Sequence, residues 1–253
     1  MPSASSPYSR VILKISGESF AKSGESGIDP IRLSHIAKEI VDAAECGTQI
    51  AVVVGGGNMV RGAELAEQGH IDRSTADYMG MIATVINGLA LREALTGLGR
   101  DSRLMTALDI PAIGEPFIRA RALRHFEKGR VLVLAAGTGN PYFTTDTCAA
   151  LRGAELNADV LLKATKVDGV YTADPHTDPT AKRYTRLTFA EAIEKQLAVT
   201  DLTALTMCME NNLPVIVFEF GTAGNIRRVI GGEQIGTMIT THADGGGPGS
   251  NLG

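Results

Sequence analysis

The sequence predicts an α/β protein with an open, mostly parallel sheet sandwiched between helices. Short apolar runs of strand length recur along the chain, at residues 11–15, 50–54, 131–135, 160–162 and 215–218. Segments with helical periodicity separate these runs. That alternation is typical of βα units, which place helices on both faces of a parallel sheet.

Capping residues and apolar periodicity locate helices between the expected strands. Asp29 and Pro30 supply an N-cap and a first helical position, and Gly47 ends that helix before the second strand. Residues 201–211 form a further helix that ends before Pro214. The segment 74–98 is a long helix whose apolar residues at helical spacing we expect to face the core: Met79, Ile82, Val85, Ile86, Leu89 and Ala90.

The 253 residues suffice for one large α/β domain, and no internal repeat or linker-like stretch interrupts residues 9–241. We therefore expect a single domain over residues 8–241. The glycine-rich segment from residue 242 onward cannot bury a core, and the first residues are rich in Ser and Pro. Residues 1–7 and 242–253 are thus expected to be disordered tails.

Composition excludes several classes of protein. The formal net charge of -4 leaves no basic footprint for nucleic acid, and no window approaches the roughly 18 apolar residues of a membrane span. Three cysteines lack a CxxC spacing, and the five histidines are scattered, so neither a disulfide framework nor a zinc site is indicated. We expect a cytoplasmic protein that binds neither nucleic acid nor membranes.

Three glycines at residues 55–57 directly follow the second expected strand. Glycine permits close backbone approach, so the N–H groups of such a loop can contact a phosphate. Arg61 would add a planar bidentate donor to the same pocket. An ordinary tight turn between strand and helix explains three glycines as well, and the two interpretations remain open at this point.

Other polar groups follow the remaining strands, and the carboxyl ends of parallel strands share one edge of a sheet. Lys14 interrupts the first apolar run and would be costly to bury without a partner, unless it lies on an edge strand and reaches water. Residues 137–146 combine glycines, hydroxyls, an amide and the carboxylate of Asp146, which either orients a cation or only caps a helix. Residues 162–175 carry two lysines and a tyrosine among turn signals at Asp168 and Asp174, and fit either plain turns or a nucleotide site.

Several well-known catalytic patterns are missing from the sequence. It contains no GxxxxGK[ST] motif and no GxGxxG motif between a strand and a helix, which disfavours a P-loop kinase and a dinucleotide oxidoreductase. The GxSxG motif of serine hydrolases is missing as well.

Taken together, residues 13–18, 55–62, 77–81, 137–146 and 163–174 resemble the amino acid kinase family, in its UMP kinase branch. The resemblance covers roughly residues 8–241. It implies an enzyme without a P-loop that transfers the γ-phosphoryl group of ATP to UMP in pyrimidine nucleotide biosynthesis, giving UDP and ADP. It also implies dependence on Mg²⁺, held mainly through nucleotide phosphates with no assigned protein ligand, and a homo-oligomer that is expected to be a hexamer.

The resemblance assigns roles to matching positions. Lys14, Arg61 and Asp146 would be catalytic, Asp77 would bind the UMP ribose, and Thr145 would lie near the base. The residues expected to contact ATP are Lys14, Ile15, Ser16, Gly17, Gly57, Arg61, Thr165, Tyr171 and Asp174. The residues expected to contact UMP are Gly56, Asp77, Thr138, Gly139, Asn140, Pro141, Tyr142, Phe143, Thr144 and Thr145.

Family members are commonly activated by GTP and inhibited by UTP. Arg92, Arg103 and Arg130 stand where effector-site arginines lie, although Thr96 and Arg119 depart from the family pattern. Two other functions are weighed against UMP phosphorylation. An acyl-phosphate-forming kinase is disfavoured by residues 138–146, which match the nucleotide-accepting branch. A non-catalytic nucleotide sensor is disfavoured because Lys14, Arg61 and Asp146 are all present.

Overall fold

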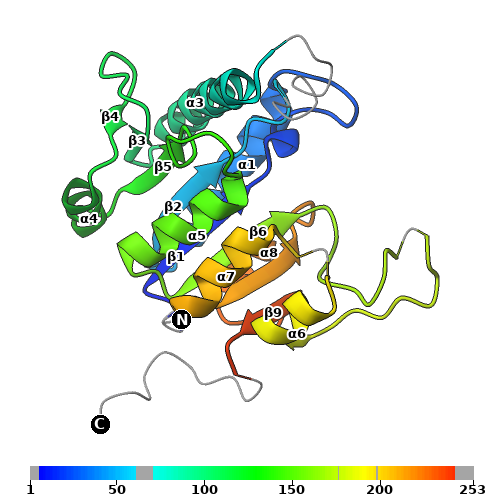
Figure 1. Cartoon of the computed structure of the whole chain (residues 1–253). Helices are drawn as coiled ribbons and strands as arrows, with labels where there is room; N and C mark the ends of the chain where they lie inside the picture. The colour runs from blue at the N-terminus through cyan, green and yellow to red at the C-terminus, as the bar shows by residue number, and fades with distance from the viewer. Residues whose placement is uncertain (1–5, 61–70, 176, 198, 243–253) are drawn as a thin grey trace.

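A computed structural model describes residues 6–60, 71–175, 177–197 and 199–242, and Figure 1 shows their arrangement. Nine strands form one sheet in the order β4-β3-β5-β2-β1-β6-β8-β9-β7. All neighbouring strands are parallel except β8 and β9. The strands are β1 (Arg10–Ile15), β2 (Gln49–Val54), β3 (Ser102–Thr106), β4 (Glu115–Pro116), β5 (Val131–Ala135), β6 (Val160–Thr165), β7 (Arg186–Thr188), β8 (Val215–Glu219) and β9 (Thr237–Thr240).

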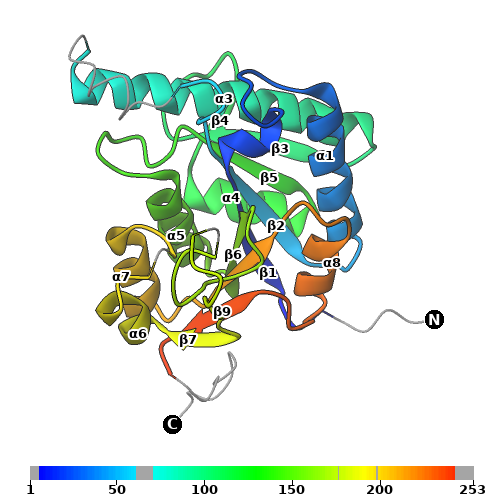
Figure 2. The same cartoon turned by 90° about the vertical axis from the view of Figure 1, so that its right-hand side faces the viewer.

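The helices lie on both faces of this sheet (Figure 2). Buried side chains of α1 (Pro30–Ala44), α3 (Arg73–Gly97) and α8 (Asn225–Ile230) pack in one core with alternate strand residues such as Val11 and Leu13. The opposite core contains residues from α4 (Arg119–Glu127), α5 (Thr145–Leu156), α6 (Phe189–Glu194) and α7 (Leu202–Glu210), together with Ile12 of β1. A short 3-10 helix, η1 (Gly17–Phe20), follows β1. The predicted sandwich of a mostly parallel sheet between helices is confirmed.

Capping explains where several helices begin. Asp29 accepts a hydrogen bond from the backbone N–H of Arg32, and Pro30 occupies the first helical position of α1, as its sequence indicates. Asp201 caps α7 in the same way, through the N–H of Ala204.

Two expectations about burial are corrected. Lys14 does not lie on an edge strand, because β1 pairs with β2 on one side and β6 on the other. On α3, Val85 is buried as predicted, but Ile82 and Ile86 are 50% and 43% exposed. Ile82 and Ile86 lie four residues apart on one side of the helix, and that side faces away from the core.

The N-terminal boundary also differs from expectation. Ser6, which we assigned to a disordered tail, donates a hydrogen bond from Oγ to the carbonyl of Ile230, at 2.8 Å. This contact places Ser6 against the end of α8. Residues 1–5 and 243–253 lie outside the described residues, so the prediction of disorder there stays a prediction.

Candidate active site

Two lysines on adjacent strands share one carboxylate. Lys14 of β1 and Lys163 of β6 are paired in the sheet register, so both side chains leave the same face, toward α5 and α7. Lys14 Nζ lies 2.8 Å from Asp146 Oδ1, and Lys163 Nζ lies 2.5 Å from Asp146 Oδ2. The exposed fraction of the side chain is only 12% for Lys14, 17% for Asp146 and 14% for Lys163. The sequence thus builds a largely buried Lys–Asp–Lys cluster at the carboxyl ends of the central strands.

The electrostatics of this cluster keep the carboxylate charged. Burial alone would raise the pKa of Asp146, but the ammonium groups of Lys14 and Lys163 lower it well below its ordinary value. Burial lowers the pKa of Lys163, and the charge of Asp146 opposes that shift. Lys163 Nζ also donates to the carbonyl of Val199 (2.6 Å), and Thr200 Oγ1 donates to Asp146 Oδ2 (2.7 Å).

Asp146 does not cap the helix on which it stands, so the capping-only interpretation is wrong. The N-cap of α5 is Thr144, whose Oγ1 accepts from the backbone N–H groups of Asp146 and Thr147, each at 3.1 Å. Thr144 and Thr147 in turn donate their hydroxyls to Asp201, at 2.5 and 2.9 Å. Asp201 therefore fastens the first turn of α5 to the start of α7 and fixes Asp146 between the lysines.

The loops that follow β1 and β2 meet backbone to backbone. A Cβ added at Gly17 would lie 2.4 Å from the N of Gly57, and one added at Gly55 would lie 2.6 Å from the N of Gly17. A Cβ at Gly56 would lie 2.7 Å from the carbonyl of Gly80 on α3. Close packing thus requires these glycines. Gly57 differs, since its Cβ would meet no atom of the described residues within 4 Å, and it faces open space.

A cavity of about 250 Å³ lies between this glycine loop, α3 and the segment 137–145. Many residues that we assigned to UMP border it, which shows that distant segments meet here. From those assignments the lining contains Gly56, Asp77, Thr138, Asn140, Phe143, Thr144 and Thr145, together with Gly57 from the ATP set. Arg73 and Thr84 of α3 also line it.

The other residues assigned to UMP belong to the same segment but lie outside this lining. A Cβ on Gly139 would lie 3.0 Å from the carbonyl of Ala107, so Gly139 packs against the end of β3. Tyr142 is 65% exposed, and its N–H donates to Asp77 Oδ2 at 2.8 Å. Pro141 lies in the chain between Gly139 and Tyr142. Arg61 lies outside the described residues.

The residues assigned to ATP are spread over a wider region. Ile15 ends β1 in the core, and Ser16 precedes η1. Thr165, at the end of β6, borders a separate cavity of about 220 Å³ together with Ser19 and Phe220. Tyr171 donates its hydroxyl to Asp168 Oδ1 (2.7 Å), in the exposed segment that also holds Asp174. The structure brings Gly17 and Gly57 together, while Tyr171 and Asp174 follow β6 in a separate segment.

Comparison with known proteins identifies the family of the chain. Residues 9–219 match the amino acid kinase family. The chain belongs to this family.

Solved structures from three organisms have the family fold and are similar to the chain. A UMP kinase from Bacillus anthracis is 39% identical with a TM-score of 0.91, covering 94% of this chain and 98% of that one. A UMP kinase from Ureaplasma parvum is 37% identical with a TM-score of 0.86, covering 91% and 98%. A uridylate kinase from Archaeoglobus fulgidus is 31% identical with a TM-score of 0.71, covering 91% and 99%. The predicted resemblance to this family is confirmed.

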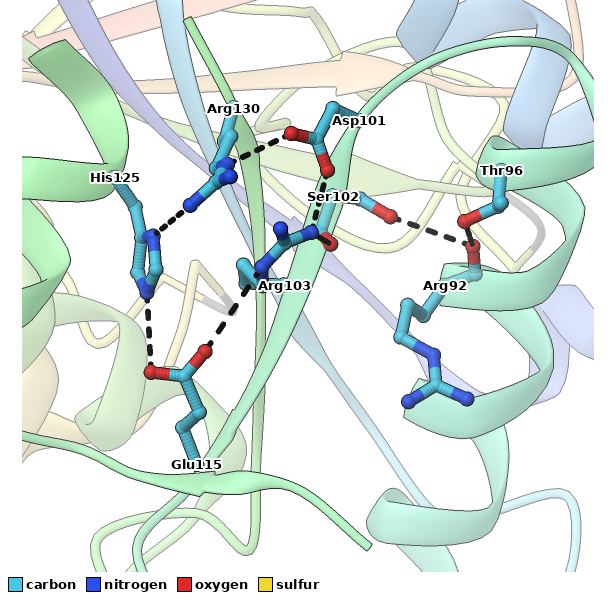
Figure 3. A network of polar contacts seen from close by, with 8 residues as sticks. All are labelled: Arg92, Thr96, Asp101, Ser102, Arg103, Glu115, His125 and Arg130. Atoms are coloured by element: carbon cyan, nitrogen blue, oxygen red, sulfur yellow. Dashed lines mark hydrogen bonds and ion pairs between the residues drawn. The ribbon is translucent and has the colours of Figure 1, made fainter. Parts of the chain in front are cut away.

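Away from the lysine cluster, a more open cavity of about 670 Å³ is lined by Arg92 and Thr96 of α3, Arg103 of β3 and Glu115 of β4. Figure 3 shows the polar network beside it. Asp101 pairs with Arg103 and with Arg130 Nε, the latter at 2.7 Å. His125 continues the network, since its Nδ1 lies 3.0 Å from Arg130 Nη1 and its Nε2 lies 3.1 Å from Glu115 Oε2. Of the three arginines predicted for effector binding, Arg103 and Arg130 share Asp101. Arg92 joins Arg103 in the cavity lining, whereas Arg130 lies outside it.

Sequence reasoning missed several residues of the site. Lys163 was noted only within a lysine-containing segment, and its equivalence to Lys14 depends on the sheet register. Thr84, Asn87 and Asn58 are buried polar residues that hold the loops, and Asp201 was interpreted only as a helix start. Polar residues inside an otherwise apolar helix are a usable signal for Thr84 and Asn87, because burying them requires partners.

Among the described residues, none of the helices combines the length and the apolar composition that a membrane span requires.

Proposed function

We propose that this chain is a UMP kinase that transfers the γ-phosphoryl group of ATP to UMP, giving ADP and UDP, in pyrimidine nucleotide synthesis. The observation that carries the proposal is the junction at Thr145 and Asp146. Thr145 borders the 250 Å³ cavity, and the next residue holds both buried lysines. A nucleoside-sized pocket thus adjoins a cationic cluster, in a chain similar to three kinases of this specificity.

The residues have separate roles in this proposal. Phosphoryl transfer depends mainly on positioning and on neutralising charge. Lys14 stabilises charge on the transferred group, and Asp146 fixes the position of its ammonium. The backbone N–H groups at Gly56 and Gly57 hold phosphate oxygens, together with the side chain of Arg61.

The nucleoside of UMP lies in the cavity, and Asp77 accepts hydrogen bonds from its ribose. Ser16 and Gly17 contact the ATP phosphates, and the segments at Thr165, Tyr171 and Asp174 line the adenosine side. An oxygen of the UMP phosphate attacks the γ-phosphorus while the bond to the ADP oxygen breaks and its electron pair leaves with ADP. The attacking group is already an anion, so no general base is needed.

The donor set suits a Mg²⁺ ion that arrives with the nucleotide. Among the described residues, no three His, Cys, Asp or Glu side chains gather into a cluster that could hold a metal by itself. Asp146 is already engaged by two ammonium groups. Mg²⁺ commonly binds through one or two carboxylates together with substrate phosphates, and here the phosphates would supply most of its ligands and the ion would neutralise part of their charge.

A substrate panel tests the proposal. We expect ADP release, followed with a coupled assay, to be fastest with UMP and slow with CMP, dTMP, acetylglutamate or carbamate. Identification of UDP in the product and loss of turnover when EDTA removes Mg²⁺ complete the test. Turnover of acetylglutamate or carbamate would favour an acyl-phosphate-forming kinase, and nucleotide binding without turnover would favour a sensor.

Regulation forms a second part of the proposal. We infer that the arginine-lined cavity at Arg92 and Arg103, with Arg130 beside it, takes a nucleotide effector, GTP as activator and UTP as inhibitor. Its guanidinium groups suit phosphate oxygens, which they bind in a bidentate manner. The protein would act as a homohexamer in the cytoplasm. Turnover measured against GTP and UTP concentration, and mass measurement by light scattering, test these two points.

A further inference from the structure

A pair of buried amides lies behind the glycine loop of residues 55–58. Asn87 of α3 and Asn58 at the end of the loop are 0% and 5% exposed. Asn87 Nδ2 donates to Asn58 Oδ1 at 2.7 Å, and Asn58 Nδ2 donates back to Asn87 Oδ1 at 3.1 Å. An amide between a helix and a sheet is costly to bury unless its hydrogen bonds are made, and here they are reciprocal.

Each amide also binds backbone. Asn87 Nδ2 donates to the carbonyl of Gly55 at 2.8 Å, and Asn58 Nδ2 donates to the carbonyl of Gly27 at 2.6 Å. The N–H of Gly27 returns a bond to the carbonyl of Asn58 at 3.0 Å. The amide pair therefore ties α3 to both ends of the glycine loop, and fixes the peptide units on either side of Gly56 and Gly57.

Thr84, one turn earlier on α3, supports the other loop of the cavity. Its buried hydroxyl accepts from the N–H of Ala136 at 2.7 Å and donates to the carbonyl of Met81 at 2.6 Å. Ala136 precedes the segment 137–145 that borders the cavity. Residues three apart lie on the same side of a helix, so one face of α3 holds the two loops through two neighbouring side chains.

We propose that the Asn58–Asn87 amide pair is a positioning device for phosphoryl transfer, and that Thr84 is its counterpart for the nucleoside loop. The inference rests on the proposed function, in which Gly56 and Gly57 hold phosphate oxygens. Donors that are preorganised for the transition state act on kcat, whereas ground-state contacts with a substrate act mainly on KM. The two neighbours on α3 thus control different kinetic constants.

Three variants test this division. Asn87→Leu and Thr84→Val keep roughly the shape of each side chain and remove its hydrogen bonds. Asn87→Leu should lower kcat at least about tenfold with a smaller change in the UMP KM, as expected when transition-state donors lose their alignment. Thr84→Val should raise the UMP KM about threefold or more and leave kcat within about twofold, as expected for a ground-state effect.

The double variant Asn58→Leu/Asn87→Leu separates positioning from stability. Removing both members of a buried hydrogen-bonded pair is milder than leaving one unpaired, so its Tm should be no lower than that of Asn87→Leu. Its kcat should remain as low as that of the single variant, because the loop is still released. Recovery of kcat together with Tm would show a merely structural pair and would overturn the proposal.

Hydrogen exchange provides a readout that is independent of turnover. The amides of Met59 and Val60 donate to the carbonyl of Gly56 at 3.0 and 3.1 Å. They should exchange at least about tenfold faster in Asn87→Leu while the peptide containing Ala136 is unchanged, and the reverse should hold in Thr84→Val. Equal changes in both loops would overturn this inference alone. Failure of the wild-type protein to phosphorylate UMP would instead overturn the proposed function, and this inference with it.

Discussion

Two charged regions of this protein are built in opposite ways. The cluster of Lys14, Asp146 and Lys163 is largely buried, with each side chain less than one fifth exposed. In the arginine-rich network, Asp101 is 53% exposed and Arg103 is 33% exposed. Water and salt screen the second group far more than the first.

This difference in screening suits the two regions to different tasks, phosphoryl transfer and the binding of an incoming anion. A buried cluster of contacting charges is fixed before substrate arrives, which is what stabilising a transferred phosphoryl group requires. Exposed ion pairs are weak, so Arg103 can exchange Asp101 for an incoming anion at small cost. The helix α3 contacts the active-site loops through Thr84 and Asn87, and borders the open cavity through Arg92.

The buried carboxylate should dominate stability. Asp146→Asn leaves two buried ammonium groups without their counter-charge, so we expect the free energy of unfolding to fall by about 3 kcal/mol. The control Glu233→Gln breaks an exposed pair with Arg228 and should cost less than about 1 kcal/mol. Urea titration measures both. Equal losses in the two variants would remove the distinction between the regions.

The same variant has a pH signature. Because the pKa of Asp146 is lower in the folded protein than in the unfolded chain, its stabilisation is complete above the ordinary aspartate pKa of about 3.9 and is lost as pH falls below it. The decrease in unfolding free energy between about pH 5 and pH 2 should therefore be smaller in Asp146→Asn than in the wild type. An unchanged decrease would contradict a charged, paired Asp146.

Lys14 tests the catalytic side of the buried cluster. Lys14→Ala should lower kcat at least about a hundredfold with the fold intact, because a preorganised cation at the transferring phosphoryl group is lost. Circular dichroism checks the fold. Lys195→Ala, which removes an exposed lysine of a weak pair with Glu191, is the matched control and should keep kcat within about twofold. Unchanged turnover in Lys14→Ala would remove Lys14 from the mechanism.

The strands that the sequence predicts are those with a clear local apolar pattern, and the strands that it misses lack such a pattern. The apolar runs at β1, β2, β5, β6 and β8 are long enough to identify as strands. β3 has only Leu104 and Met105 as an apolar centre, and β4 and β7 have two and three residues, so no periodicity marks them. These strands belong to the sheet because of pairing with distant segments, which a local pattern does not contain.

The residues of the candidate site also fall into two groups, those that the sequence identifies and those whose role depends on long-range contacts. The glycine loop and residues 137–146 are recognisable because their residue types and order are unusual. The pairing of Lys14 with Asp146 joins positions far apart in the chain, and Lys163 becomes its equivalent only through the register of β1 with β6. Asn87 is one polar residue in a long helix, and its role appears only when Gly55 and Asn58 are placed against it.

Asp77 tests the substrate-binding role of the cavity beside the start of α3. Asp77→Ala should raise the UMP KM about tenfold and change kcat little, because a ribose contact exists in both the ground and transition states. The Asp77→Ala variant also loses the hydrogen bond that the N–H of Tyr142 donates to Asp77, and this loss should raise the UMP KM further. Steady-state kinetics with varied UMP measure it, with the exposed Glu194→Ala as control. A constant KM would show that the ribose lies elsewhere.

Arg103 tests the open region. Arg103→Ala should leave turnover without effectors within about twofold, because its exposed ion pairs contribute little, but should weaken half-maximal activation by GTP about tenfold or more. Arg124→Ala is the control, since Arg124 lies on α4 outside the cavity lining. An unchanged GTP response in Arg103→Ala would mean that the arginine-lined cavity does not bind the activator.

Base selection gives the smallest expected effect and the finest test of the active-site cavity. Uracil and cytosine differ at O4 and N4, so rejecting CMP requires a donor held toward O4. Thr145 contributes a hydroxyl to the cavity lining, at the first position of α5. A buried polar group left unpaired by the wrong base costs about 1–3 kcal/mol, so UMP should be preferred over CMP at least about tenfold in kcat/KM.

Thr145→Val removes this hydroxyl with little change in shape, and should narrow the preference about threefold or more while the ATP KM stays within about twofold, because only the base contact is lost. Competition between UMP and CMP in one reaction measures the ratio directly. The matched variant Thr138→Val removes a hydroxyl from the same cavity that is within 3.2 Å of both the N–H and the carbonyl of Asn140. If both variants alter the ratio equally, the cavity as a whole sets the preference. If only Thr145→Val does, discrimination lies at the residue that directly precedes the charge cluster, and one turn of α5 then joins base recognition to phosphoryl transfer.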